Sequence, residues 1–308
     1  MATTLRSTIR RTPAEQVFRG FNVIFLVTVC FLTVYPFWYV LVQSLNEGSD
    51  SIRGNLFFWP RIFTLDNYGY VLSQRSLRLA YINTIIRTVV GSFLCLFVSG
   101  LAAYSISKKD FKGRSALITY FMIPIFVGGT IVSNYIVIAK LGLLDNWLVY
   151  VLPGSFNFFF LIIIRTFING LPLSLEESAQ IDGASYFTIF FRIIIPLCMP
   201  VVATVLLFSA VGYWLDFYTN LLYVSKQSMI VLQYLLYMVL RANKMSVLSQ
   251  MQAVQTGAVA QLSGSYSKIT EESVKMTVLI VITVPILLVY PFFQRYFIKG
   301  VLIGAIKG

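Results

Sequence analysis

Long apolar runs without a single Asp, Glu, Lys or Arg recur along this chain. They cover 21–42, 88–107, 115–139, 146–164, 193–215 and 276–294, with lengths of 22, 20, 25, 19, 23 and 19 residues. A helix rises about 1.5 Å per residue, so each run is long enough to cross a hydrocarbon core of about 30 Å. The pattern predicts an all-α, polytopic membrane protein with six transmembrane helices.

Two apolar segments need a separate interpretation. The run at 227–240 has only 14 residues and is rich in Tyr, which favours a segment that lies at the membrane interface or re-enters the membrane. The first run follows a basic tail, as in a signal peptide. However, it is too long and lacks a small-residue cleavage site, so we expect it to remain as a membrane anchor.

The composition supports a membrane protein. Apolar residues make up 57% of the chain and charged residues 12%, against about 25% charged in soluble domains. The net charge of +12 would suggest nucleic acid in a soluble protein. In a membrane protein, Lys and Arg instead collect in cytoplasmic loops, so we expect no nucleic-acid partner.

Loop charges predict the orientation. Four of the seven positions between the second and third runs are basic, namely Lys108, Lys109, Lys112 and Arg114, whereas Lys140 is alone in the next loop. Both termini are therefore predicted in the cytoplasm. The inside segments then carry 13 basic and 5 acidic residues, and the outside segments 11 and 7.

The sequence lacks the residues that several kinds of chemistry require. The sequence has no His, and Cys30, Cys95 and Cys198 show no CxxC spacing, so we expect small core hydrophobes and no metal site or disulfide. It also has no Gly-x-x-x-x-Gly-Lys-[Ser/Thr] loop, so we expect no ATP hydrolysis by this chain and no enzyme activity.

The predicted spans carry no acidic or basic side chain that could bind a coupling ion, which favours a cytoplasmic partner as the energy source. A self-sufficient ion-coupled secondary transporter or channel remains the alternative, because backbone carbonyls can also bind sodium.

The segment between the fourth and fifth runs has the pattern of a short cytoplasmic helix. Gly170 and Pro172 are expected to stop the preceding helix, and Ser174 with Glu177 forms a capping box that begins a new one. Gly183 is expected to end or bend that helix. Four aromatic residues then share one helical face and are predicted to pack under the bundle: Tyr186, Phe187, Phe190 and Phe191.

The same residues resemble the EAA motif of ABC importer permeases. That motif reads Glu-Ala-Ala, three residues, Gly, nine residues, Ile, one residue and Leu-Pro. Here Glu177-Ser178-Ala179, Gly183, Ile193 and Ile195-Pro196 keep the full spacing, with Ser for Ala and Ile for Leu.

Further resemblance narrows the family. The segments at 63–68, 141–145 and 293–308 are similar to the second permease subunit of carbohydrate importers of the maltose type. The chain as a whole is similar to the branch associated with oligosaccharides, including uronate-containing ones.

The resemblance implies a type I ABC importer transmembrane domain at 79–295, with a coupling loop at 169–192. It is preceded by a cytoplasmic tail, first transmembrane helix and outer segment at 1–78, and followed by a cytoplasmic tail at 296–308. The chain would sit in the bacterial plasma (inner) membrane and form half of a sugar pathway. Its implied partners are a second permease subunit in a heterodimer, two ATP-binding subunits that hold ATP and Mg, and an extracytoplasmic solute-binding protein. No cofactor is expected on this chain.

In this family a coupling helix sits in a cleft of the ATPase. The implied docking residues here are Glu177, Ser178, Ala179, Asp182 and Gly183. The alternative is that Glu177 only caps its own helix.

The outer end of the fifth run is a candidate sugar pathway. It holds an acid and an amide among aromatic rings, namely Tyr213, Trp214, Asp216, Tyr218 and Asn220. Rings stack on the C–H faces of sugars while carboxylates and amides bind hydroxyl groups. An interfacial aromatic belt is the alternative. Asn83 is a further candidate, although Asn83 and Asn134 are of a type that more often bonds between helices.

Two remaining segments resemble functional parts of the family. The Ser-, Gln- and Gly-rich stretch at 243–268 resembles an outer loop that releases sugar from the binding protein, or it is only a flexible loop. The end at 300–308 resembles a tail inserted between the ATPases, or it is a basic terminus at the lipid surface.

Overall fold

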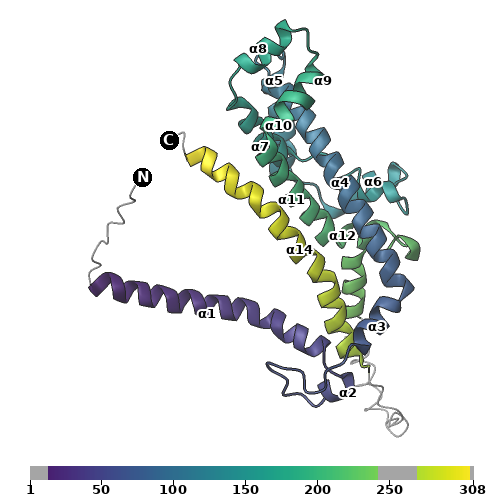
Figure 1. The fold of residues 1–308 in the computed structure, drawn as a ribbon. Coiled ribbons are helices and arrows are strands. Elements are labelled where there is room, and N and C mark those ends of the chain that lie inside the picture. The colour runs from purple at the N-terminus through teal and green to yellow at the C-terminus, as the bar shows by residue number, and fades with distance from the viewer. Residues whose placement is uncertain (1–12, 242–268, 306–308) are drawn as a thin grey trace. The chain divides into compact units, whose positions relative to one another are not determined.

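The computed structural model describes residues 13–241 and 269–305, which form helices and one isolated β-bridge between Asn46 and Phe63 (Figure 1). This confirms the all-α prediction. The chain divides into two compact units, Met1–Gly69 with Leu262–Ile280, and Tyr70–Gln261 with Val281–Gly308. We describe each unit by itself. The predicted functions of 243–268 and of 306–308 lie outside the described residues.

The first unit is dominated by α1, Pro13–Ser44, which contains the first predicted span. Its most apolar window is 0% buried, so its apolar side chains face outward all round, as in a helix that other molecules surround. The short helix α2, Gly48–Ser51, and the start of α3, Asp66–Ser73, follow. The long helix α14, Glu271–Ala305, contains the sixth predicted run and begins in this unit.

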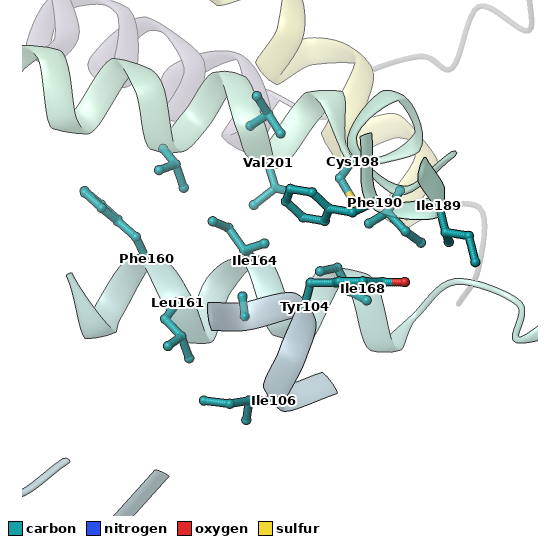
Figure 2. Close-up of a cluster of buried hydrophobic side chains, with 14 of the residues drawn as sticks. Tyr104, Ile106, Phe160, Leu161, Ile164, Ile168, Ile189, Phe190, Cys198 and Val201 are labelled. Atoms are coloured by element: carbon teal, nitrogen blue, oxygen red, sulfur yellow. The ribbon is translucent and has the colours of Figure 1, made fainter. Parts of the chain in front are cut away.

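The second unit is built around α4, Arg75–Ser107, which packs against α7, Phe158–Asn169, and α11, Met199–Leu215. Figure 2 shows the core at one end of this bundle, where Tyr104 of α4, Phe160 of α7 and Val201 of α11 converge with Phe190. Cys95 and Cys198 are buried as predicted, whereas Cys30 is exposed on α1. The remaining bounds in this unit are α9 Tyr186–Ile189, the π-helical turn η2 Phe190–Ile194, α10 Ile195–Leu197, α12 Tyr218–Tyr223 and the 3₁₀ turn η3 Gln227–Met229.

Three of the predicted spans are broken. The run at 115–139 forms α5, Arg114–Val127, and α6, Ile131–Lys140. Gly128 separates them with φ of 62°, a backbone conformation that ends a helix. The run at 146–164 begins as the 3₁₀ turn η1, Trp147–Tyr150, and becomes helical again only in α7.

The third break lies between α10 and α11, where the axis bends by 86°. Among the described residues, α1 and α4 are long and apolar enough to cross a membrane, and two bent helix pairs raise that number to four. The prediction of six spans therefore stays a prediction.

Candidate functional site

The loop expected to couple to an ATPase folds as two short helices beyond one end of the bundle. The chain bends by 81° between α7 and α8, Ser174–Ile181. Figure 1 shows α8 and α9 together at the end of α4 that lies away from α12. The loop therefore projects from the bundle because the chain bends between α7 and α8.

Gly183 ends α8, as predicted. Its φ is +77°, its N–H donates to the Gln180 carbonyl at 3.0 Å, and the next N–H, of Ala184, donates to the Ala179 carbonyl at 3.0 Å. This pair of bonds is the Schellman arrangement, which needs a left-handed residue and therefore favours glycine. A Cβ at Gly183 would meet nothing within 4 Å, so space within this chain does not require glycine there.

The start of α8 differs from the prediction. The residue before the helix is Leu173, and no side chain caps the first turn, so the capping-box prediction for Ser174 and Glu177 is wrong. A turn supplies an acceptor instead, because the Leu175 N–H donates to the Pro172 carbonyl at 3.3 Å. Glu177 is left exposed.

The helix α8 has a buried side and an exposed side. Ala179 is only 9% exposed and belongs to the buried cluster, so its small side chain lets α8 lie against the bundle. Glu177, Ser178, Asp182 and Gly183 are exposed. Ile181, which the motif did not indicate, is 87% exposed. Its signal in the sequence is an isolated Ile between Gln180 and Asp182.

The four aromatic residues after α8 do not share one environment. Phe190 is buried, and Phe191 stacks on Phe97 with ring centroids 6.3 Å apart. Tyr186 and Phe187 are exposed, so the prediction that all four pack under the bundle is wrong. Both lie at the start of α9, whereas Ile189 at its end and Phe190 after it are buried in the core (Figure 2).

An ion pair ties this loop to α4. Lys108, directly after α4, pairs with Glu176 of α8, and its Nζ also lies 4.0 Å from the centre of the Tyr104 ring. A cavity of about 820 Å³ lies between the end of α4, the basic segment after it and α8, with Lys109, Arg114 and Glu177 among its lining residues. Glu176 is thus paired within the chain, while Glu177 faces outward.

The other end of the bundle contains a buried charge. Arg87 is 0% exposed, donates to the carbonyls of Tyr213 and Asp216, and lies 3.4 Å from Asp216 Oδ2. The carbon of its guanidinium lies 5.1 Å from the centre of the Tyr150 ring. The prediction that the spans carry no charge is wrong for α4. The predicted run at 88–107 was defined as a stretch without charged residues, so it began just after Arg87. The helix itself begins at Arg75 and therefore includes Arg87.

Three of the predicted sugar-pathway residues bond within the chain. Asp216 Oδ1 accepts from the first two N–H groups of α12, those of Tyr218 at 2.9 Å and Thr219 at 3.1 Å. Asn220 is fully buried and accepts from the Val231 N–H at 2.9 Å. Asn83 donates to the carbonyls of Ser228 at 2.8 Å and Ile230 at 3.0 Å, the kind of bond between segments that its residue type favours.

The aromatic candidates differ in how much of their ring surface and which polar atoms remain without a partner in the chain. Tyr213 is held between two glycines, because a Cβ at Gly91 would lie 2.5 Å from its ring and one at Gly154 would lie 2.5 Å from its hydroxyl oxygen. Trp214 has a buried Nε1 without a hydrogen-bond partner, and Tyr218 is exposed. These last two retain polar atoms or ring surface for a ligand.

An aromatic row beside Tyr218 was not singled out from the sequence. Phe217 stacks on Tyr237 with centroids 5.2 Å apart, and Tyr234 lies 6.0 Å from Tyr237. Arg241 Nη1 donates to the Tyr237 hydroxyl at 2.9 Å. The many Tyr residues at 227–240 were the signal in the sequence for this row. The spacing of these residues did not show that one of their rings contacts Phe217, which follows α11.

Comparison with known proteins settles the family. Residues 96–303 match the family described as "Binding-protein-dependent transport system inner membrane component". This chain belongs to that family. It is therefore a membrane component of a transport system.

Two curated relatives match nearly the whole chain. Protein LplC of Bacillus subtilis (strain 168) is 38% identical over 301 residues, covering 98% of each chain. The polygalacturonan/rhamnogalacturonan transport system permease protein YtcP of the same organism is 36% identical over 286 residues, covering 92% of this chain and 96% of that protein.

A solved structure shares the fold. A chain in the crystal structure of a bacterial ABC transporter involved in the import of the acidic polysaccharide alginate has a TM-score of 0.81 at 24% identity. The match covers 93% of this chain and 99% of that chain. The fold is therefore that of a type I ABC importer transmembrane domain.

Proposed function

We propose that this chain is a permease subunit of an ATP-driven importer for a sugar or oligosaccharide. A relative at 36% identity is named as a polygalacturonan/rhamnogalacturonan permease, which supports an oligosaccharide that contains uronate. The observation that carries the proposal is the exposed surface of α8, a short helix that projects beyond the bundle and bears Ile181 at 87% exposure. The same loop also exposes Leu173, Leu175, Tyr186 and Phe187, and several exposed apolar side chains in one loop favour a protein partner.

The partner on α8 is the ATP-binding subunit, of which the importer has two, each holding ATP and Mg. Glu177, Ser178, Asp182 and Gly183 line the exposed side, and Ile181 adds an apolar contact. Ala179 supports this surface from beneath, since it packs on the bundle. In this proposal the permease hydrolyses nothing, and movement of α8 opens and closes the pathway.

The other partners complete the importer. A second permease subunit forms the other half of the pathway, and an extracytoplasmic binding protein delivers the sugar. The basic segment after α4 lies beside α8, which supports a cytoplasmic position for this loop and for both termini in a bacterial cell. The domain limits 1–78, 79–295 and 296–308 belong to the same proposal.

The sugar path is supported at the opposite end of the bundle. Trp214 and Tyr218 keep free polar atoms or ring surface, and the row of Phe217, Tyr234 and Tyr237 adds further aromatic faces. Such faces stack on sugar rings. Asp216, Asn220, Tyr213 and Asn83 shape this region through bonds and packing within the chain.

Ile181→Glu tests the docking surface. The change places a charge in an apolar contact, so the ATP-binding subunit is expected to be lost when the permease is purified by a tag. Ile181→Met is the matched control, because it keeps an apolar side chain of similar size, and it should retain the subunit. Both variants should insert into the membrane in equal amounts, since residue 181 makes little contact within the chain.

Equal recovery of the ATP-binding subunit with Ile181→Glu and with the wild-type chain would refute docking through this surface. Loss with both variants would also refute the apolar contact, because Ile181→Met preserves it.

A further inference from the structure

Residues 45–67 of the first unit have their polar groups inside and their apolar groups outside. Asn46, Asp50 and Asn67 are buried. The exposed residues in the same stretch include seven large apolar side chains: Ile52, Phe57, Phe58, Trp59, Ile62, Phe63 and Leu65. In water the opposite arrangement is favoured, so the surroundings of this loop are not simply water.

Asn46, Asp50 and Arg61 form a hydrogen-bonded network inside the loop. Asn46 Nδ2 donates to Asp50 Oδ2 at 3.0 Å, while its Oδ1 accepts from the Ile62 N–H at 2.9 Å. Arg61 Nε lies 2.9 Å from the same Asp50 oxygen, and Arg61 Nη2 donates to the Gly54 carbonyl at 2.7 Å. The bond from Asn46 and the charge of Arg61 lower the pKa of Asp50, so this carboxylate stays ionised. The loop is therefore held in one shape.

The outer face of the loop folds back along the end of α1. Trp38 Nε1 donates to the Phe58 carbonyl at 2.9 Å, and the Trp38 and Trp59 rings meet edge to face with centroids 5.7 Å apart. The Tyr35 and Phe58 rings lie 5.8 Å apart. The tip of the loop thus lies level with Tyr35 and Trp38 on α1.

This level corresponds to the membrane interface. The apolar run of α1 extends to Val42, four residues beyond Trp38 and seven beyond Tyr35. At about 1.5 Å per residue, the loop tip lies about 6 to 10 Å inside the end of the run. Trp and Tyr concentrate at this depth, and interfacial segments bury their apolar faces to about 5–10 Å.

We propose that residues 57–63, which we call the aromatic hook, insert into the lipid headgroup region at the C-terminal end of α1. The hook continues the outward-facing apolar surface of α1, the most apolar window of which is 0% buried. Arg53 is exposed four residues before Phe57 and supplies positive charge for lipid phosphates. The hook fixes how deeply this end of α1 sits in the bilayer.

The test uses nitroxide labels on the full chain in nanodiscs of phosphatidylcholine and phosphatidylglycerol. With Cys30→Ala removing the exposed native thiol, one variant carries Trp59→Cys and the matched control carries Asp66→Cys, an exposed polar position in the same unit. The ratio of accessibility to oxygen over accessibility to a water-soluble nickel chelate is expected to be severalfold higher at 59 than at 66, because oxygen concentrates in lipid.

Three results would overturn the proposal. High nickel accessibility at position 59 would mean that the hook lies in water. Protection from both reagents would mean that a second copy of this chain covers it. Repeating the measurement with the binding protein present should leave the ratio at 59 unchanged, and a fall in oxygen accessibility would assign the hook to that protein instead.

A second measurement keeps the native hook. With Trp147→Phe and Trp214→Phe, the remaining tryptophans are Trp38 and Trp59. Lipids brominated near the headgroup should quench the emission of both, and a further Trp59→Phe change should remove the Trp59 component and leave only that of Trp38. Absence of quenching would refute the lipid contact even if the labelled variants fail to fold.

Discussion

Burial of the Arg87 charge costs free energy, which its neighbours must offset. A charged side chain without exposure loses its hydration, and the loss is recovered only through close partners. Here the partners are the Asp216 carboxylate, two backbone carbonyls and the Tyr150 ring. The position of Asp216 at the end of α11 is therefore set by a charge on α4.

Asp216→Asn should destabilise the fold by about 3–5 kcal/mol, because it leaves the Arg87 charge buried without its counter-ion. Asn keeps an acceptor oxygen for the first two N–H groups of α12. Adding Arg87→Met should recover much of the loss, since the stranded charge is then gone. The free energy of unfolding in detergent measures both effects. If the double variant were no more stable than Asp216→Asn, the pair would not be the cause.

Single residues show what a motif spacing can predict. Gly183 was predicted to end α8 because its φ requirement is local and only glycine meets it without strain. The motif could not tell that Ala179 faces the core and Ile181 faces outward, since both depend on which side of α8 meets the bundle. The capping-box prediction was wrong because the Pro172 carbonyl accepts from the Leu175 N–H at the start of α8 instead.

At the scale of elements, α4 and α11 meet around one ring. Tyr213 of α11 lies against Gly91 of α4, and its hydroxyl lies against Gly154 in the segment before α7. Any side chain at these two positions would collide with it. Three segments therefore approach one another only as closely as two glycines allow.

Tyr213→Phe should restore stability to an alanine variant at one of the two glycines but not at the other. Gly154→Ala should destabilise the fold by about 1–3 kcal/mol, and Tyr213→Phe should relieve it because the hydroxyl is the nearest atom. Gly91→Ala should cost a similar amount, about 1–3 kcal/mol, but Tyr213→Phe should not relieve it, because the ring itself blocks that Cβ. Thermal unfolding of the four variants decides between these outcomes. Equal rescue at both positions would contradict the placement of the ring.

Apolar runs predicted which segments are helical but not where they break. Hydropathy averages over a run, whereas a break depends on backbone geometry at one or two residues such as Gly128. The bend of 86° after Leu197 likewise falls within an uninterrupted apolar run. The buried charge of Arg87 was missed for a related reason, because a tertiary partner 129 residues away stabilises it.

At the scale of the whole molecule, family and fold were predictable because the coupling-loop motif is long and its spacing is complete. The division into two units was not, since it depends on contacts between distant segments. Which side of the loop at 45–67 is apolar depends on its folded shape, because its apolar residues follow no helical or strand period.

Transport should require the complete importer. Proteoliposomes with this chain, a second permease, the ATP-binding subunits and the binding protein should take up sugar only with ATP. This chain alone should show no uptake driven by a proton or sodium gradient, because the described part of its bundle offers a paired Arg87 and Asp216 rather than a vacant carboxylate. Gradient-driven uptake by the chain alone would support a secondary transporter instead.

The ion pair between Lys108 and Glu176 has a mechanical consequence. It fastens α8 to the end of a helix of 33 residues, which is about 50 Å long. A helix of this length acts as a lever arm, so a tilt of about 5° about one end moves the other by about 4 Å. A stroke delivered to α8 at the Lys108 end thus reaches the region around Arg87, about 30 Å along the helix, as a rigid-body tilt without any change in the helix itself.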